Sequence, residues 1–458
     1  MKICVYHIFI FSFIIYEIYS LPLKLKFKTR FNKENMNQGN VMDMLINNDI
    51  IIPISFGSNE QIIEMNVKLQ KDSTFILSNK CKENNLAKKF YRDTSKSYEE
   101  LIEENKYFMY EFSIGIISKD KIVLFDNSQK KITINDFKFV LATKLWSDAQ
   151  ADMSGMLGLI LSNKDDKPKD TDFVTQLKQN KIIDSYAFML EYTNEYEGIL
   201  YLGDYFNGSS SAIDELKTTL AGRGISKVKQ WEITTEKIYS GNTVVQNDTY
   251  IQFHYEMGIL AAPEIYRDYI KANFFKNYLD NGICKLIFNL EEISIFHKYD
   301  YIACDKNEFK PEAFPEIKFY SQDLNFNFTL NYKDLFYEFG NKIYFLAVFP
   351  RYPIDVKYWY IGKPFFLKYK LFMDKDKKTI GLYKNYIKKE IIVVEIETNN
   401  NNKSLYIIII IILVFVLIGV LYYFLKVRIS RKLRANELED KFSYIPISES
   451  KKKAKKIF

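Results

Sequence analysis

The sequence predicts an all-β domain followed by one transmembrane helix, on two observations. Apolar and polar residues alternate from Ile50 onward in IIIPISF and IIEMNVKL, as expected of half-buried strands. Residues 405–425 form an uncharged apolar run that is long enough to cross a bilayer as a helix. The chain of 458 residues is 47% hydrophobic and 16% aromatic, which favours packed cores over disorder and leaves room for two lobes.

The beginning of the chain has the layout of a secretory signal peptide. Residues 1–20 start with one lysine, continue through an apolar run and end near the small residue Ser20. Residues 21–48 are polar and basic, and the sequence leaves open whether they form a pro-segment or an edge strand.

Residues 151–206 carry the most specific pattern of the chain. Gly155 and Gly158 lie within an apolar run, which predicts close backbone approach beside a buried strand. Phe173 and Leu177 are four residues apart and predict a short amphipathic helix. Two strands joined by a polar turn are expected to follow, around Ala187–Tyr192 and 199–202.

This pattern resembles the pepsin-like (A1) aspartic proteases, whose first lobe carries D-G-I-L-G-L, then a helix and a hairpin ending in G-x-L-x-L-G. Residues 153–159 (MSGMLGL) stand at the first place and GILYLG stands at the second. Further matches around Trp231, Pro263 and Gly381 extend the resemblance over about residues 49–384. It implies an all-β, bilobal pepsin-like fold followed by the C-terminal transmembrane helix.

The resemblance divides the chain into seven parts. These are a signal peptide (1–20), an N-terminal segment or pro-region (21–48), an N-terminal β lobe (49–212), a C-terminal β lobe (213–384), a stalk (385–404), the transmembrane helix (405–425) and a basic cytosolic tail (426–458).

In the pepsin-like family each lobe supplies one Asp in D-[TS]-G, and the two carboxylates share a proton while they activate a water. The family spacing, counted from the first turn and from the following cysteine, places Lys68 at the first catalytic position. The second lobe's Pro263 places His254 at the other. Asp72, four residues later in D-S-T, is the alternative for the first position. Glu256 stands at the second glycine position, where its size is expected to obstruct the loop.

The resemblance therefore implies a catalytically inactive pseudoprotease that binds an extended polypeptide as an added strand, beneath a flap hairpin carrying Tyr110. Two alternatives stay open: an active aspartic endopeptidase with an atypical dyad, and a structural surface protein that uses the fold as a scaffold. No cofactor or metal motif is evident, and the oligomeric state is not predicted.

Three cysteines remain once the signal peptide is removed. The resemblance implies a disulfide between Cys284 and Cys304, which leaves Cys81 free or intermolecular. Sequons for N-glycosylation, compatible with a lumenal domain, occur at Asn207, Asn247, Asn327 and Asn402.

The basic charge of the chain belongs to its tail. Residues 426–458 carry eleven Lys or Arg and four Asp or Glu, which accounts for the whole net charge of +7 and removes support for nucleic-acid binding. The positive-inside rule puts this tail in the cytosol, which predicts a single-pass type I membrane protein.

Two short patterns in the tail bear on localisation. Lys455 and Lys456 resemble a dilysine signal for retrieval to the endoplasmic reticulum, whereas Tyr444 and Ile447 resemble a tyrosine-based sorting motif. The compartment therefore stays open between the endomembrane system and the cell surface, with the dilysine pattern favouring the endoplasmic reticulum.

Overall fold

The computed structural model describes residues 22–30, 36–37, 40–69, 71, 73–81, 87–101, 108–110, 113–145, 153–160, 171–203, 216–220, 230–289, 298–351 and 357–383, all within one compact unit that extends to Lys389. The predicted signal peptide, stalk, transmembrane helix and tail lie outside these residues, as do Asp72, Asn207, Asn402, Tyr444, Ile447, Lys455 and Lys456. Within the described ranges, no helix has the length and apolar character needed to cross a membrane.

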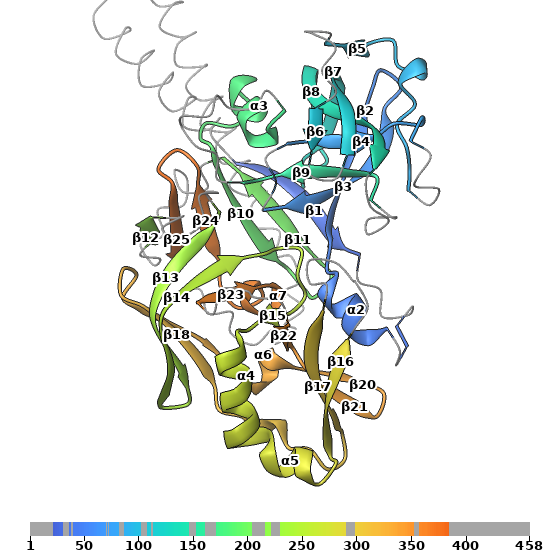
Figure 1. Cartoon of the computed structure of the whole chain (residues 1–458). Coiled ribbons are helices and arrows are strands. Elements are labelled where there is room, and N and C mark those ends of the chain that lie inside the picture. The colour runs from blue at the N-terminus through green and yellow to red at the C-terminus, as the bar shows by residue number, and fades with distance from the viewer. Residues whose placement is uncertain are drawn as a thin grey trace, which may run out of the picture. The chain divides into compact units, whose positions relative to one another are not determined.

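The described strands form two large sheets, so the prediction of a mostly β fold is confirmed (Figure 1). The first has 14 described strands, in the order β12-β25-β24-β10-β11-β1-β2-β3-β9-β4-β8-β7-β5 with β6 paired to β7. Their bounds are β1 (Leu23–Thr29), β2 (Ile50–Phe56), β3 (Gln61–Lys68), β4 (Phe75–Leu77), β5 (Glu99–Glu100), β6 (Phe108–Tyr110), β7 (Ser113–Phe125), β8 (Lys131–Leu145), β9 (Gly155–Gly158), β10 (Ala187–Tyr192), β11 (Glu197–Leu202), β12 (Leu216–Leu220), β24 (Leu371–Asp374) and β25 (Thr379–Tyr383).

The second sheet has 11 described strands, in the order β19-β18-β13-β14-β23-β15-β22-β17-β21-β20 with β16 paired to β17. Their bounds are β13 (Glu232–Ser240), β14 (Thr243–Phe253), β15 (Leu260–Ala261), β16 (Cys284–Asn289), β17 (Tyr299–Asp305), β18 (Ile317–Ser321), β19 (Phe326–Leu330), β20 (Phe336–Phe339), β21 (Lys342–Phe345), β22 (Ala347–Pro350) and β23 (Tyr358–Ile361).

The described helices are short. They are α2 (Val41–Ile46), η2 (Arg92–Thr94), α3 (Phe173–Gln179), α4 (Glu264–Ile270), η4 (Lys271–Phe275), α5 (Lys276–Asp280), η5 (Pro311–Ala313), α6 (Tyr332–Leu335) and α7 (Lys363–Phe366). The predicted helix at Phe173 is α3, whose N-terminus is capped by the Asp172 side chain accepting from the amide of Thr175 at 2.6 Å.

The strand β1 lies inside the first sheet, because it pairs with β11 on one side and with β2 on the other. Its residues alternate between buried and more exposed, with Leu23, Leu25 and Phe27 in the core. The edge strand considered for residues 21–48 is therefore not what the structure shows. The described residues of this range include the interior strand β1 and the helix α2.

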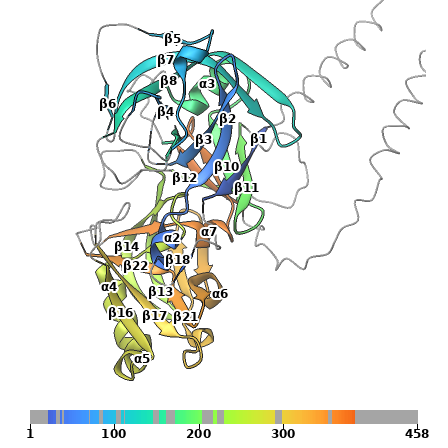
Figure 2. The same cartoon turned by 90° about the vertical axis from the view of Figure 1, so that its right-hand side faces the viewer.

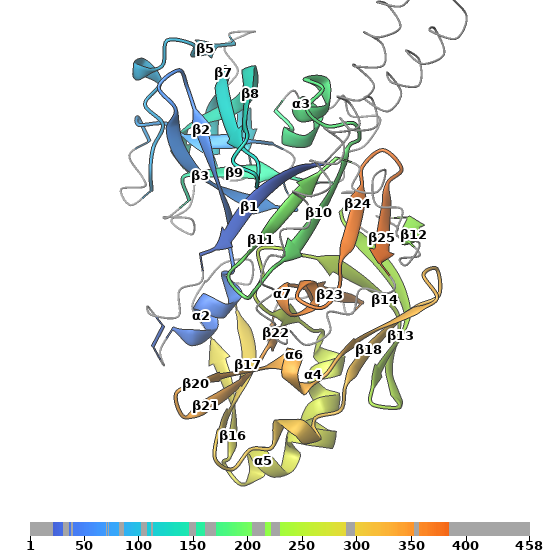
Figure 3. The same cartoon turned by 180° about the vertical axis from the view of Figure 1, so that it is seen from behind.

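The end of the described chain returns to the first sheet, next to β10. The strand β24 pairs with β10, and Phe188 lies opposite Met373 (Figure 3). A buried ion pair, 2.7 Å between Lys375 Nζ and a carboxylate oxygen of Asp172, joins the same region to the cap of α3. Strands far apart in the sequence thus form one platform.

One local topology occurs in both sheets. In the first, β9 is inserted between β3 and β4, parallel to β3 and antiparallel to β4. In the second, β23 is inserted in the same way between β14 and β15. We call β3, β9 and β4 the first motif and β14, β23 and β15 the second motif. The first loop (residues 68–74, of which 68, 69, 71, 73 and 74 are described) and the second loop (residues 254–259) connect the outer strands of each.

One glycine in each motif lets its loop pass in backbone contact. A Cβ placed on Gly158 would lie 2.4 Å from the carbonyl oxygen of Lys71, and a Cβ placed on Gly362 would lie 2.3 Å from that of Met257. Carbon and oxygen atoms do not approach this closely without a bond, so any side chain would push the loop away. The two loops therefore cross their motifs in the same manner.

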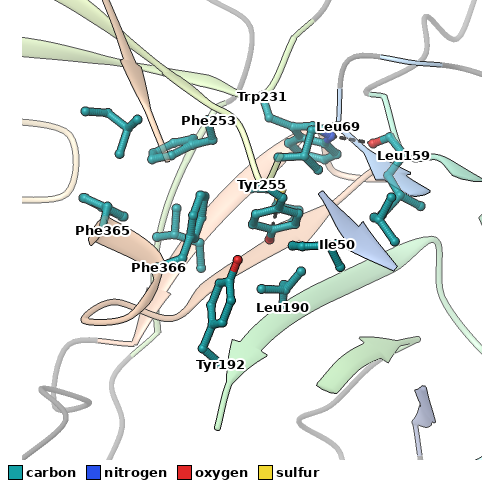
Figure 4. Packing of buried hydrophobic residues seen from close by; sticks show 14 of the residues in the cluster. Ile50, Leu69, Leu159, Leu190, Tyr192, Trp231, Phe253, Tyr255, Phe365 and Phe366 are labelled. Carbon is teal, nitrogen blue, oxygen red and sulfur yellow. Dashed lines mark hydrogen bonds between the residues drawn. The ribbon is translucent and has the colours of Figure 1, made fainter. Parts of the chain in front are cut away.

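A shared apolar core joins the two motifs. The Trp231 indole, which precedes β13, donates a buried hydrogen bond of 2.7 Å to the carbonyl of Leu159, which follows β9 (Figure 4). Trp231 also packs edge-on against Phe188 of β10, with 5.4 Å between ring centroids. This packing places the first and second loops close together.

Candidate functional site

Lys68 and His254, predicted at the catalytic positions of the resembled family, occupy equivalent positions of the two motifs. Lys68 ends β3 and pairs with Gly158, whereas His254 directly follows β14. Each lies three residues before the carbonyl that contacts its motif's glycine, that of Lys71 in the first loop and that of Met257 in the second. The equivalence follows from backbone contacts alone, independently of any family spacing.

The residues that follow these two side chains point into the shared core. Leu69 and Tyr255 are both fully buried and lie in one apolar cluster around Trp231 (Figure 4). Tyr255 packs against Phe366 with 4.5 Å between ring centroids. Apolar packing therefore holds the two loops where they meet.

Lys68 is paired with Asp49, a residue that none of the sequence patterns had indicated. The Lys68 Nζ lies 2.6 Å from Asp49 Oδ1, and the two side chains are 16% and 18% exposed. Burial works to lower the pKa of Lys68, but the charges of Asp49 and Glu256 outweigh it and the net pKa is raised. Lys68 is therefore a stable cation with a fixed partner.

The hairpin register explains this pairing. Ile51 of β2 lies opposite Asn66 of β3. Two residues further along the same antiparallel ladder, Asp49 and Lys68 come opposite each other, where opposite charges attract across strands. The alternation that identifies both strands and the turn between them could have revealed Asp49.

His254 is paired with Glu256 in the second loop. Their Nδ1 and Oε1 atoms are 3.3 Å apart, and both side chains are 5% exposed. Burial works to raise the pKa of Glu256, but the hydrogen bond from His254 and the charges of His254 and Lys68 lower it more, to about 2. Contrary to the expectation from its size, Glu256 fits in the loop because its carboxylate is turned toward His254.

These contacts leave each carboxylate at the junction facing a basic group. Asp49 faces Lys68, and Glu256 faces His254 and the charge of Lys68. A proton-sharing acid pair needs two carboxylates close enough that both cannot ionise. The arrangement instead sets a basic side chain against each carboxylate, which is the opposite electrostatic condition.

Two buried polar atoms at the junction lack a hydrogen-bond partner among the described residues: His254 Nε2 and Glu256 Oε2. Glu256 Oε2 is an acceptor, whereas His254 Nε2 accepts in the neutral imidazole protonated on Nδ1 and donates in the imidazolium, so a water would satisfy both atoms. As for metals, the described part of the chain contains no group of three His, Cys, Asp or Glu side chains that could hold an ion.

Tyr110, which the resemblance places on a flap, ends a short strand that pairs with β7. The strands β6 and β7 form a hairpin in which Tyr110 pairs with Ser113, so Tyr110 stands in the last pair before the turn.

The disulfide prediction is confirmed. Cys284 and Cys304 lie opposite each other on β16 and β17 and are bonded. Cys81 is buried in a small apolar cluster of the first sheet. Of the four sequon residues, Asn247 on β14 and Asn327 on β19 are described, and both are exposed.

No protein-family model matches this chain, and no curated protein matches its sequence. Because a fold alone hosts many activities, function has to be inferred from the chemistry of the junction itself.

The carboxylate of Glu256 should make stability depend on pH in the acid range. Its folded pKa of about 2 lies below the ordinary value of 4.5, so it stabilises the fold above pH 4.5 and loses that contribution as the pH falls toward 2. Glu256→Gln should lower the free energy of unfolding at neutral pH by about 3 kcal/mol, since each pKa unit corresponds to about 1.4 kcal/mol. The difference from wild type should shrink steadily as the pH is lowered.

Urea unfolding followed by tryptophan fluorescence at several acid and neutral pH values measures this difference. Glu312→Gln, at an exposed position, serves as the control and should unfold like wild type throughout. A Glu256→Gln deficit that stays constant over the whole pH range would show that packing, rather than charge, accounts for the effect.

Proposed function

We propose that this protein is a membrane-anchored, pepsin-like pseudoprotease whose bilobal domain binds an extended polypeptide without cutting it. The observation that carries the proposal is the occupation of the two equivalent loop positions by Lys68 and His254, each with a carboxylate partner. The repeated inserted-strand motif, the hairpin at Tyr110 and the Cys284–Cys304 disulfide also support a pepsin-like fold.

The chemistry of the junction argues against hydrolysis. Activation of a water requires a carboxylate that accepts its proton, and efficient general bases have a pKa near the working pH. Glu256, with a pKa of about 2, is a weak base, and Asp49 is engaged by Lys68. A protonated lysine cannot take the proton from water. Binding, by contrast, needs only backbone partners and an open position beside the loops.

The proposal includes the predicted placement in the cell. A signal peptide, one span at residues 405–425 and a basic tail give a type I protein whose β domain is lumenal or extracellular, anchored in the bilayer. The exposure of Asn247 and Asn327 is compatible with a glycosylated face. The dilysine pattern at Lys455 and Lys456 favours the endoplasmic reticulum.

The test is an activity and binding assay of the full-length protein in detergent. Unfolded globin incubated between about pH 3 and 6, the range in which an acid pair holds one proton, should remain intact. Immobilised peptide libraries should retain the protein. Cleavage that pepstatin inhibits would overturn the proposal in favour of an active endopeptidase, with Asp72→Asn then locating its first acid. Failure to bind any peptide would favour a purely structural protein.

A further inference from the structure

The backbone of residues 46–48 is added to the second loop as a short antiparallel strand. The amide of Asn48 donates to the carbonyl of Glu256 at 3.0 Å, and the amide of Gly258 donates to the carbonyl of Ile46 at 3.3 Å. Asn47 and Met257 form the bridge between these bonds. Such bonds recognise an extended chain whatever its side chains are.

The glycine of this loop permits the closest approach. A Cβ on Gly258 would lie 2.0 Å from the carbonyl oxygen of Leu45. Any side chain at this position would therefore displace the added strand. The second loop is shaped to receive a backbone at this place.

Polar side chains anchor the same segment at the centre of the junction. Asn48 is 1% exposed, donates from Nδ2 to the Tyr192 hydroxyl at 3.1 Å and accepts at Oδ1 from Lys363 Nζ at 3.5 Å. The next residue, Asp49, pairs with Lys68 at 2.6 Å. The segment thus places the carboxylate of Asp49 against the ammonium group of Lys68, the residue predicted at the first catalytic position.

The helix α2, directly before this segment, docks on the second sheet (Figure 2). Its buried residues share one apolar cluster with the second loop and with strands β15, β17, β21 and β22. The buried members of that cluster are Met36, Val41, Met42, Leu45, Ile46, Met257, Ile259, Ala261, Tyr299, Ala303, Tyr344, Leu346 and Val348. The Tyr299 hydroxyl also donates to Asp43 Oδ1 at 2.9 Å. We call residues 41–49 the arm.

We infer that the arm is an intramolecular ligand, which fills the place where an external extended polypeptide would add to the second loop. The inference rests on the proposed function, because it concerns the same loop, and it adds how binding is controlled and what is bound. The chain continues from the arm into β2, so the arm is always present at high effective concentration. An external polypeptide binds only when the arm has left, and it needs an extended backbone ending in a carboxylate side chain that reaches Lys68.

The experiment measures binding of a labelled peptide with the arm's own sequence, VMDMLINND, to the full-length protein in detergent. Val41→Asp combined with Leu45→Asp puts charges on the buried face of α2 and should release the arm. Binding should then become at least about tenfold tighter than in wild type, because the competent fraction of molecules rises. Ile265→Asp puts the same charge at a 50% exposed apolar position of α4, outside the arm and the second loop, and is the matched control. A peptide carrying Asn in place of Asp49 should bind the released protein more weakly.

Each outcome separates the inference from the proposed function. Equal affinity of wild type and the released variant for the peptide would overturn the inference while leaving peptide binding intact. No binding to either protein, by this peptide or by the peptide library, would overturn both. Leu45→Ala, a milder change, guards against misfolding and should show a smaller gain of the same sign. In wild type, hydrogen exchange at the Gly258 amide should be slow, and it should stay slow in the Ile265→Asp control. Fast exchange at this amide in wild type would contradict a docked arm.

Discussion

Replacing Gly362 by alanine should cost more stability than most single substitutions in this protein. The new Cβ would lie 2.3 Å from two carbonyl oxygens, those of Met257 and Ile259. The backbone of Gly362, with φ −110 and ψ −153, is extended, so the cost comes from crowding rather than from a conformation reserved for glycine. Because both obstacles are backbone atoms of the second loop, they cannot swing aside, and we expect a loss of about 3 kcal/mol or more.

The matched control is Gly282→Ala. Gly282 has a φ of +71 and an ideal Cβ there meets nothing within 4 Å, so this change tests backbone strain without crowding. It should cost about 1 kcal/mol. Urea unfolding of both variants, followed by tryptophan fluorescence, gives the comparison. If Gly362→Ala is no worse than Gly282→Ala, the second loop can move away from β23, and its contact with the motif is not a fixed part of the fold.

Local patterns were sufficient for the elements that depend on neighbouring residues. The strand β10 and the helix α3 were expected where they occur, because alternation and a four-residue apolar spacing are properties of the sequence itself. The strand β1 was left undecided, although Leu23, Leu25 and Phe27 alternate with lysines. Its partner β11 (Glu197–Leu202) is far from it in the sequence, and such distant pairing leaves no local signal.

The candidate site was predictable only in part, for the same reason. Spacing identified Lys68 and His254, and the motif geometry places them equivalently. Predicting the contact of Asp49 with Lys68 requires the register of the β2–β3 hairpin. The alternation of the two strands and the position of the turn could have supplied this register. The contact between Asn48 and Glu256 joins residues far apart in sequence, and only the folded chain reveals it.

The exchange of Lys68 for aspartate is the sharpest test of the electrostatics. Lys68→Asp removes the cation that faces Asp49 and Glu256 and adds a third carboxylate beside them. Breaking a partly buried ion pair in this way should lower the free energy of unfolding at neutral pH by about 4 kcal/mol. Like charges raise the pKa of a carboxyl group, so the introduced acid is destabilising above its ordinary pKa and the deficit should shrink as the pH falls.

Three companion variants assign the cause of this loss. Lys68→Met keeps most of the volume and removes the charge, so it should lie between wild type and Lys68→Asp. Asp49→Asn in the Lys68→Asp background relieves one repulsion and should recover part of the stability. The swap Lys68→Asp with Asp49→Lys restores an ion pair across the β2–β3 ladder and should recover more than Asp49→Asn does. The recovery should not be complete, because the introduced acid still faces Glu256 and the introduced lysine stands beside Arg30. Unfolding midpoints measured at neutral and acid pH test whether the stabilities of the variants follow this ranking.

Activity of the same variants bears on the proposed function. Lys68→Asp supplies one acid of a pair, but His254 still stands at the equivalent position of the second loop, with Glu256 bound to it. Since activation of water by a proton-sharing pair needs both carboxylates, the variant should not hydrolyse unfolded globin at any acid pH. Only the further changes His254→Asp, Glu256→Gly and Gln70→Gly rebuild the arrangement of the resembled family. Pepstatin-sensitive cleavage by Lys68→Asp alone would mean that a second acid already faces this position, and the protein would then have to be regarded as one substitution away from a protease.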